Sequence, residues 1–323
     1  MRVLITGIGG FAGSHLAEHL LAQPGLEVWG TVLNGAGYAE ALSDRLVLRT
    51  LDLTDAGAVR TLLDTYRPER IYHLAASSVV GSSWENPWPT LENNIRAQLN
   101  LLHGLVELEL ESRILCVSSA EIYGRVAPEE LPIDEEAALR PESPYGVSKV
   151  TQDMLAYQYF RSYGLFTIRA RPANHIGPRQ SPGFVGPAFA QQIAEIEAGL
   201  RPPVMQVGNL TAQRDFTDVH DMVRAYHLLL ERGEAGEAYN IGSGVPRAIS
   251  QLLDFMLAAA QVEIDIQEDP ERMRPSDVPV SYVDASKARG ATGWTRQIPF
   301  EQSVLSVLED WRQRVRDVTY TQN

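Results

Sequence analysis

The sequence has little cysteine and a shortage of positive charge. Its one cysteine, Cys116, cannot form an internal disulfide, which favours a reducing compartment and a buried thiol. Lys and Arg number 28 against 41 Asp and Glu, so the net charge is −13. Because no basic stripe is available to neutralise a phosphate backbone, we expect no nucleic-acid partner.

Long apolar runs are also missing. No uninterrupted apolar stretch approaches the roughly 20 residues that a membrane span requires, so we expect no membrane partner. Met1 leads straight into RVLITG, without a basic and then apolar leader. With 323 residues, of which 44% are hydrophobic, we expect a cytoplasmic globular protein with one large core and a smaller lobe, or two unequal domains.

Residues 1 to about 170 alternate short β-branched runs with helical patterns. The runs are RVLIT, EVWGTV, LVLRTLD, RIYHLAA, RILCVSS and LFTIRAR. Near-continuous apolar strands separated by crossover helices are typical of a parallel sheet that is covered on both faces. We therefore predict an α/β fold with a doubly wound parallel sheet, the Rossmann arrangement.

The first predicted strand runs into TGIGGFAGSHLAEHL, a glycine-rich turn followed by a helix. Residues without a Cβ let a pyrophosphate approach the backbone, and the helix N-terminus offers N–H groups and a positive dipole end. Two registers fit: Gly7, Gly9 and Ala12 match G-x-G-x-x-A, and Gly7, Gly10 and Gly13 match G-x-x-G-x-x-G. Between a strand and a helix at the start of a βαβ series, this loop predicts dinucleotide binding.

From about residue 175 proline and glycine become frequent, and the regular alternation stops. Helices are predicted near 184–198, 218–232, 249–260 and 300–315, with short strands and loops between them. We predict a dinucleotide-binding domain at residues 1–173, which also receives segments near 215–245. Residues 174–323 mainly form a smaller, mixed α/β substrate-binding lobe.

The end of the second predicted strand leaves the form of the cofactor open. An acidic residue there binds the adenosine ribose hydroxyls and an arginine binds a 2′-phosphate, but Thr31, Leu33 and Asn34 carry neither charge. NAD and NADP therefore both remain candidates. Asp52 closes the third strand, where it either receives the adenine amino group or caps the following helix.

His15, Glu18 and His19 spell H-x-x-E-H, which is a zinc signature in some peptidases. The motif lies on the helix that follows the glycine loop, and the N-terminus of this helix is already predicted to bind a phosphate. We therefore expect no metal site.

The stretch SPYGVSKVTQDML places Tyr145 four residues before Lys149 at the start of a predicted helix, so both lie on one helix face. Taken alone, the pair is also typical of a solvated helix surface. Strand five ends in CVSSAEIYG, at the sheet edge where doubly wound folds deliver catalytic side chains. Ser118, Ser119 and Glu121 are the candidates there, and strand-end turn chemistry is their other interpretation.

A dinucleotide loop, a strand-five hydroxyl and Tyr-x-x-x-Lys together resemble the extended short-chain dehydrogenase/reductase family over nearly the whole chain. The resemblance implies that Tyr145 gives a proton to a carbonyl oxygen, that Ser119 hydrogen-bonds this oxygen, and that a hydride reaches the carbon. It also implies that Lys149, near an oxidised nicotinamide, lowers the pKa of Tyr145 and holds the nicotinamide ribose. The residues that we expect at the NADP or NAD cofactor are Gly7, Gly10, Phe11, Ala12, Gly13, Asn34, Asp52, Leu53, Leu74, Ala75, Ala76, Tyr145 and Lys149.

The stretches RPANHIGPRQSPGFVGP, VGNLTAQRDFTDVHDMVRAY, YNIGSG and MRPSDVP are similar to the nucleotide-sugar branch of that family, especially to its GDP-mannose group. This resemblance implies a nucleotide-diphosphate sugar as substrate, with a GDP-sugar favoured. The implied substrate contacts are Ser83, Ser119, Glu121, Asn174, Val185, Arg214, Arg274 and Asp277. Arg214 and Arg274 would clamp the diphosphate through planar guanidinium groups, or else form ordinary salt bridges to Asp215 and Asp277.

Within this group NHIGPRQSPGFV is similar to the reductase, and Leu33 and Asn34 depart from the arginine pair of the dehydratase. The resemblance thus implies NAD(P)H-dependent reduction of the C4 ketone of GDP-4-keto-6-deoxy-D-mannose to GDP-D-rhamnose. Glu121 is available to remove a C5 proton. GDP-mannose 4,6-dehydratase, or another nucleotide-sugar dehydratase or 4-epimerase that recycles its nicotinamide, is therefore the alternative.

Two long predicted helices, 87 to 109 and 144 to 163, carry apolar positions beyond those needed to cover the sheet. These positions include Leu101, Leu102, Leu105, Met154, Leu155 and Tyr159. In the family such helices pair across a two-fold axis, so the resemblance implies a homodimer through a four-helix bundle. In the other interpretation these residues all face their own sheet.

Overall fold

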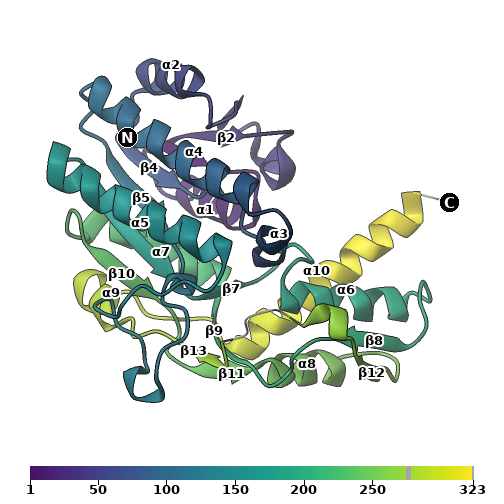
Figure 1. Cartoon of the computed structure of the whole chain (residues 1–323). Coiled ribbons are helices and arrows are strands. Elements are labelled where there is room, and N and C mark those ends of the chain that lie inside the picture. Colours follow the sequence, from purple (N-terminus) through teal and green to yellow (C-terminus); the bar gives the residue numbers. More distant parts are fainter. Residues whose placement is uncertain (274–277, 322–323) are drawn as a thin grey trace.

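Seven parallel strands form the central sheet of the computed structural model, which describes residues 1–273 and 278–321 (Figure 1). In spatial order they are β10 (Ala238–Ile241), β6 (Phe166–Pro172), β5 (Arg113–Val117), β4 (Arg70–His73), β1 (Arg2–Thr6), β2 (Glu27–Val32) and β3 (Val47–Thr50). The chain steps outward from β1 to β3 and then returns to β4 on the other side. This order confirms the predicted doubly wound sheet.

Helices cover both faces of the sheet because successive strand residues point to opposite sides. Val3 and Ile5 pack in one core with α1 (Phe11–Leu21), α7 (Val219–Arg232) and α9 (Ser286–Thr292). Leu4 packs on the other face with α2 (Ala56–Tyr66), α4 (Pro87–Glu107) and α5 (Pro144–Tyr163). The strands are therefore apolar on both sides, as their sequences predict.

A smaller lobe lies beside the carboxyl ends of the strands, at the lower right of Figure 1. Its core joins Phe189, Leu252 and Val304, which come from three different helices. The helices and the parallel strand pair of this lobe are α6 (Val185–Glu197), α8 (Ile249–Ala258), α10 (Phe300–Thr321), β8 (Val204–Val207) and β12 (Asp265–Glu268).

Short strands connect the two parts of the molecule. They are β7 (Asn174–Ile176), β9 (Gln213–Asp218), β11 (Pro246–Ala248) and β13 (Val280–Ser281), and β9 pairs with each of the other three. After β9 the chain returns through α7 to β10, the edge strand of the large sheet. The domain boundary that we placed at residue 173 stays a prediction.

The remaining short elements are α3 (Val80–Glu85), η1 (Gly37–Leu42), η2 (Ala120–Ile122), η3 (Pro128–Glu130) and η4 (Pro270–Arg272).

Helices α4 and α5 pack side by side, but most of the apolar positions that we named for a dimer do not face outward (Figure 1). Leu101, Leu102 and Leu105 are fully buried in their own core, Tyr159 is nearly so, and Leu155 packs against the same core. Of the six residues only Met154 is exposed, at 38%. For the other five the interpretation that they face their own sheet is correct, because they lie on the inner helix faces.

Within the described ranges, no helix is long and apolar enough to cross a membrane.

Candidate active site

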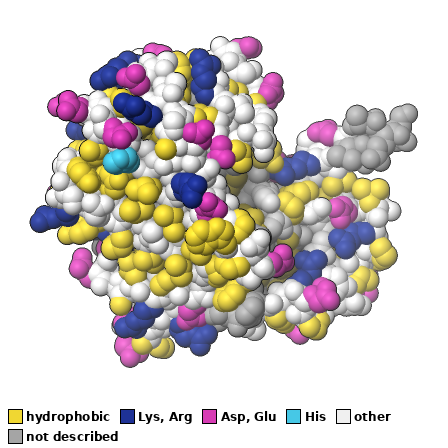
Figure 2. Space-filling model, turned by 45° about the horizontal axis from the view of Figure 1, so that its top comes forward, with side chains coloured by type: hydrophobic (Ala, Val, Ile, Leu, Met, Phe, Trp, Pro, Cys, Tyr) yellow, Lys and Arg dark blue, Asp and Glu magenta, His cyan; other side chains and the backbone are white. Residues whose placement is uncertain are grey.

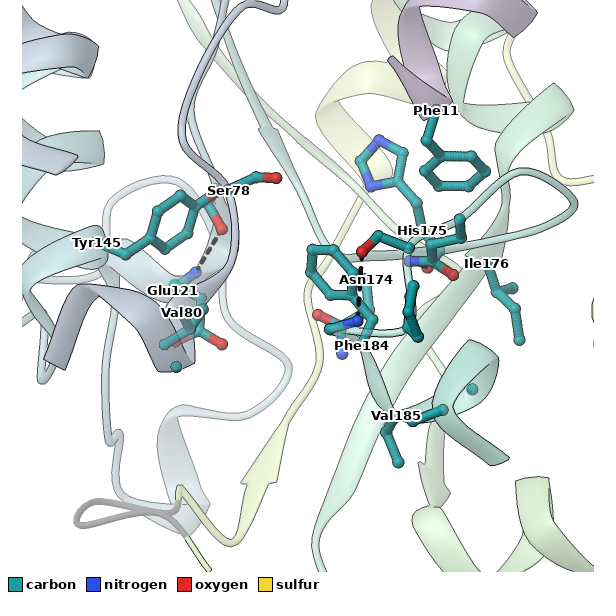
Figure 3. A pocket seen from close by; sticks show the side chains of 18 of the residues that line it. Phe11, Ser78, Val80, Glu121, Tyr145, Asn174, His175, Ile176, Phe184 and Val185 are labelled. Atoms are coloured by element: carbon teal, nitrogen blue, oxygen red, sulfur yellow. Dashed lines mark hydrogen bonds between the residues drawn. The ribbon is translucent and has the colours of Figure 1, made fainter. Parts of the chain in front are cut away.

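A cleft of about 1130 Å³ separates the carboxyl edge of the large sheet from the smaller lobe. Figure 3 shows Tyr145, Glu121 and Val80 on one wall and Asn174 and Val185 on the other. The glycine loop and the residues that follow β4, β5 and β6 also line it. The cleft therefore lies where open α/β sheets bind ligands.

The glycine loop is packed so tightly that side chains are excluded at specific positions. A Cβ on Gly13 would lie 2.2 Å from the Gly7 carbonyl oxygen, and one on Gly9 would lie 2.5 Å from the Ala36 oxygen. Gly7 adopts the left-handed φ of +71°. A Cβ on Gly10 would meet only the Gly7 oxygen, at 3.3 Å. Packing within the protein therefore requires glycine at positions 7, 9 and 13, and residues of both predicted registers are needed.

The N-terminus of α1 opens into the cleft. Within the described chain, its N-cap Gly10 has no side-chain hydrogen bond to cap the helix, and the first turn contains no acidic residue. Gly10, Phe11, Ala12 and Gly13 all line the cleft. Backbone N–H groups and a positive dipole end therefore face the cavity, an arrangement that fits the pyrophosphate of a dinucleotide.

Other predicted cofactor residues divide into two sets. Leu74, Ala75 and Ala76 follow β4 and line the cleft, together with Tyr145 and Lys149. Three further residues are not among the described residues that line it, namely Asn34, Asp52 and Leu53.

The side chain of Asp52 is engaged locally. Its Oδ1 accepts hydrogen bonds of 2.8 Å from both the amide and the hydroxyl of Thr54, while Asp55 caps α2. The Asp52 side chain thus stabilises the turn that precedes α2. Its contact with adenine stays a prediction.

Tyr145 is the second residue of α5, which begins after Ser143. The Ser143 hydroxyl accepts a hydrogen bond from the Gly146 amide, and Gly164 ends the helix with a φ of 71°, so local sequence sets both ends. The Tyr145 side chain is buried, and the Ser119 hydroxyl lies near enough to the phenol to affect its pKa. A phenol and an alcohol thus meet at the end of β5.

The pKa of Tyr145 is raised, not lowered, in the chain by itself. Burial is the main cause, the Glu121 carboxylate adds to it, and the hydrogen bond with Ser119 opposes it. Burial also lowers the pKa of Lys149 to about 7. The lowering that we expect for Tyr145 beside an oxidised nicotinamide is thus not a property of the protein alone, where burial has the largest effect on the phenol.

Ser118, the neighbouring candidate, has a structural role. Its hydroxyl donates to the Lys149 carbonyl oxygen at 3.2 Å, and its side chain is buried. Ser119, not Ser118, therefore lines the reactive part of the site beside the phenol.

Glu121, Asn174, Val185 and Arg214 all line the cleft as predicted substrate residues. Arg214 Nη1 donates to the carbonyl oxygens of Gln213 and Val278 at 2.9 and 2.6 Å. These contacts hold the guanidinium against the smaller lobe.

The suggested partner Asp215 instead accepts hydrogen bonds from Ser243 and Gly244, at 2.6 to 3.0 Å. The predictions for Arg274 and Asp277 fall outside the described residues.

Ser83 does not support the predicted contact with the sugar. Its side chain has no exposed surface, and its hydroxyl donates to the Val80 carbonyl oxygen at 2.7 Å. The same hydroxyl accepts a hydrogen bond from the Tyr145 amide at 3.3 Å. Ser83 thus attaches α3 to the start of α5, because both helices meet at this point.

Sequence reasoning missed a hydrogen-bonded pair in the cleft, His175 and Tyr226. His175 Nε2 lies 2.7 Å from the Tyr226 hydroxyl, and burial lowers the histidine pKa to about 4. Both residues line the cleft, and Figure 3 shows the His175 ring next to Phe11. His175 directly follows Asn174 in the stretch NHIGPRQSPGFV, so the sequence could have pointed to it. Tyr226 lies on α7, and no pattern around it in the sequence indicates a site.

The histidines of the H-x-x-E-H stretch have separate partners. His15 Nε2 lies 3.0 Å from the Pro178 oxygen, and His19 Nε2 lies 3.0 Å from Nδ1 of His227. Among the described residues, no group of three or more His, Cys, Asp or Glu side chains is arranged to hold a metal ion.

Known proteins resemble this chain over nearly its whole length. It is 35% identical to the GDP-6-deoxy-D-mannose reductase of Pseudomonas aeruginosa, an alignment that covers 98% of this chain and 99% of the relative. It is 28% identical to a GDP-mannose 4,6-dehydratase of Vibrio cholerae, with 96% and 93% covered.

Solved structures agree with this similarity. RMD from Pseudomonas aeruginosa complexed with NADPH superposes with a TM-score of 0.86 at 34% identity, covering 97% of this chain and 99% of that one. The UDP-glucose 4-epimerase of Thermus thermophilus in complex with NAD gives 0.87 at 31% identity, covering 97% and 99%. The family model of GDP-mannose 4,6 dehydratase matches residues 4–307. The chain therefore belongs to the GDP-mannose 4,6 dehydratase family, within the short-chain dehydrogenase/reductase fold that its motifs predicted.

Proposed function

We propose that this protein reduces the C4 ketone of GDP-4-keto-6-deoxy-D-mannose to the hydroxyl of GDP-D-rhamnose, with NADPH or NADH as reductant. The observation that carries the proposal is that Tyr145 and the neighbouring Ser119 share one cleft with Lys149 and the glycine loop. The 35% identity to a GDP-6-deoxy-D-mannose reductase supports the choice of substrate.

The dinucleotide fits the residues present, because the glycine loop leaves its backbone and the N-terminus of α1 open to the cleft. When bound there, NADPH or NADH supplies the hydride for the ketone carbon. Gly7, Gly10 and Gly13 would hold the pyrophosphate, and residues 74–76 would lie along the dinucleotide. The large sheet, with the strand from the 215–245 segment, would form the dinucleotide-binding part, and residues 174–323 mainly the substrate-binding part.

The reducing direction needs a proton donor, and the Tyr145 phenol can act as one. Because the pKa of Tyr145 is raised, its phenol is protonated at neutral pH and can give its proton to the ketone oxygen as the hydride arrives. Ser119 donates a hydrogen bond to the same oxygen and stabilises the charge that develops on it. Lys149 lines the same cleft and donates a hydrogen bond to the Val117 carbonyl oxygen, so that it would hold the nicotinamide ribose of the bound cofactor.

The substrate would lie between the two walls of the cleft. Asn174 at the start of β7 and Val185 at the start of α6 face the cavity from the smaller lobe. We expect the Arg214 guanidinium, which lines the cleft, to bind the diphosphate. Glu121 stands beside the reactive phenol, close enough to raise its pKa.

The second candidate function is that of a nucleotide-sugar dehydratase or epimerase that recycles its nicotinamide. The position of Glu121 favours it, because a carboxylate beside Tyr145 can remove the C5 proton of a transiently oxidised sugar.

One pair of reactions tests both functions. In the first, the enzyme, the ketosugar and NADPH or NADH are mixed, and the absorbance of the reduced cofactor is followed. Loss of absorbance in step with GDP-D-rhamnose formation supports the reductase. In the second, GDP-mannose and the oxidised cofactor are supplied, and conversion without net cofactor change supports the alternative.

We also propose a homodimer that is built on α4 and α5. Figure 2 shows hydrophobic side chains gathered on the face of the molecule that these helices form. Trp88 is 64% exposed, and Leu99, Val147 and Tyr157 are between 38% and 44% exposed. With Met154 these residues suit the centre of a four-helix bundle, and a mass of two chains in solution is the expected result.

The buried Cys116 thiol agrees with a cytoplasmic location.

A further inference from the structure

Two arginines from distant parts of the chain flank one tyrosine at the rim of the cleft. Arg179 follows β7 and Arg314 lies on α10. Their guanidinium carbons are 6.0 and 5.5 Å from the centre of the Tyr38 ring. All three side chains line the cleft, and none belongs to the residues that we assigned to cofactor or substrate.

This rim adjoins the glycine loop. The Tyr38 amide donates to the Gly9 carbonyl oxygen at 3.0 Å, and Arg179 Nη1 donates to the Ser14 hydroxyl at 3.2 Å, one turn into α1. The N-terminus of α1 is the natural position for a phosphate. The two cations therefore border the place where the dinucleotide phosphates belong.

Both guanidinium groups have hydrogen-bonding capacity to spare. Arg179 pairs with Glu18 at 2.6 Å and Arg314 with Asp310 at 2.6 Å, yet a guanidinium has five N–H donors. Among the described residues, Arg314 Nη2 has no partner in hydrogen-bond geometry, although Asp310 lies close to it. The two side chains are only 26% and 25% exposed, so an anion there would be bound in a partly dry site.

The backbone of Arg179 is held in an unfavourable conformation. Its φ of 71° is left-handed, which is uncommon for a residue with a Cβ. Asp310 Oδ2 accepts a 2.9 Å hydrogen bond from the Arg179 amide and so fixes this conformation from α10. The fold thus orders the two arginines through one shared carboxylate.

We propose that Arg179 and Arg314 bind a phosphate group of the dinucleotide cofactor, across from the glycine loop. The inference rests on the proposed function only for the identity of this cofactor. Two phosphates share the required chemistry: the pyrophosphate, which NADH and NADPH both carry, and the 2′-phosphate of NADPH alone. The pair supplies the cations that the end of β2 lacks, since Leu33 and Asn34 are uncharged.

The variant Arg314→Gln tests the proposal without any sugar. The dissociation constants of NADPH and NADH are measured by the fluorescence of the reduced nicotinamide. We expect NADPH to bind about 10- to 100-fold more weakly, the effect of losing a charge-assisted hydrogen bond. An equal loss for NADH assigns the pair to the pyrophosphate, and an unchanged NADH affinity assigns it to the 2′-phosphate. Unchanged affinity for both cofactors overturns the proposal.

Matched variants separate binding from folding. Arg316→Gln removes an exposed arginine two residues along the same helix, which pairs with Glu309 at 2.9 Å, and is expected to leave both affinities unchanged. Arg314→Lys keeps the charge and is expected to recover part of the affinity. Arg179→Gln repeats the test from the other side, with circular dichroism to verify the fold. Competition by 2′-AMP and by ADP gives the same assignment independently.

The two proposals fail in different ways. If no ketosugar is reduced but Arg314→Gln still weakens NADPH binding, the proposed reaction is wrong and the phosphate site stands. If reduction proceeds and both arginine variants bind the cofactors normally, the reaction stands and the phosphate site is wrong.

Discussion

The Lys149 ammonium lies 5.8 Å from the centre of the Tyr145 ring and donates a 2.8 Å hydrogen bond to the Val117 carbonyl oxygen. The lysine is thus attached to the end of β5 and does not act directly on the phenol hydroxyl in the chain by itself. Burial lowers the pKa of this lysine, which lines the cleft where a cofactor would lie.

Replacing Tyr145 by phenylalanine removes the proton donor and leaves the ring. We expect kcat for ketosugar reduction to fall by about 10²- to 10⁴-fold. The affinity for NADPH should change by at most about tenfold, the effect of one neutral hydrogen bond. Steady-state kinetics and cofactor fluorescence measure the two quantities. Tyr163→Phe, at the exposed end of α5, is the matched control. A Tyr145→Phe enzyme with normal kcat would show that another group supplies the proton.

Lys149→Met should make the protein more stable and less active. Burial lowers the folded-state pKa of Lys149 from 10.5 to about 7, so the unfolded chain binds more protons between these values. The stability of the wild type therefore rises with pH from about 7 to 10.5. At pH 7 the variant should gain about 1–2 kcal/mol in free energy of unfolding, since it buries no amine.

Urea unfolding of wild type and variant at pH 7 and pH 9 measures this effect. The difference between the two proteins should shrink at the higher pH. A variant that is less stable than the wild type at both pH values would mean that the lysine stabilises the fold.

Gly13→Ala should abolish dinucleotide binding or folding of the loop. The new Cβ would lie 2.2 Å from the Gly7 oxygen, and backbone atoms cannot move aside as a flexible side chain can. Overpacking of this kind costs about 1–3 kcal/mol or more. Thermal unfolding and NADPH titration report the two effects. Gly290→Ala on α9 meets no atom within 4 Å and should be neutral or slightly stabilising. Equal behaviour of both variants would contradict the packing of the loop.

Mild acid should destabilise the contact between α1 and α7. Burial lowers the pKa of His15 and of His19 from 6.5 to about 4. Because the unfolded chain binds these protons more readily, the stability that both histidines contribute is present above about pH 6.5 and is lost as the pH falls towards 4. His220 acts in the opposite direction, because its hydrogen bond to Asp218 raises its pKa.

The variant His19→Gln isolates this effect. Its free energy of unfolding should depend less on pH between 6.5 and 4 than that of the wild type, as measured by urea titrations across that range. His103→Gln, on the exposed surface of α4, should keep the slope of the wild type. Identical slopes for all three proteins would exclude His19 as a cause.

Local signals allowed most of the sheet and of the cofactor loop to be predicted. Ser143 and Gly164 determine the ends of α5, and Gly7, Gly9 and Gly13 of the glycine loop leave no room for a Cβ. Long-range packing was not visible in the sequence. For example, the buried Ser83 hydroxyl accepts a hydrogen bond from the Tyr145 amide, which lies 62 residues further along the chain.

The same limit applies to the residues around the cleft. The inward direction of Leu101 depends on how α4 lies on the sheet. Likewise, Tyr38, Arg179 and Arg314 come together only because α10 of the smaller lobe reaches the glycine loop. No motif in the sequence links these three residues, which are separated by more than a hundred positions.

The central claim is that Tyr145 protonates a sugar ketone while the cofactor reduces it. The most direct measurement mixes wild type or Tyr145→Phe with GDP-4-keto-6-deoxy-D-mannose and NADPH or NADH, follows the absorbance of the reduced cofactor, and identifies the product by mass spectrometry. The account predicts that the wild type oxidises one cofactor molecule for each sugar reduced and that the variant is nearly inactive. No oxidation of either cofactor by the wild type, or equal rates for both proteins, would contradict it.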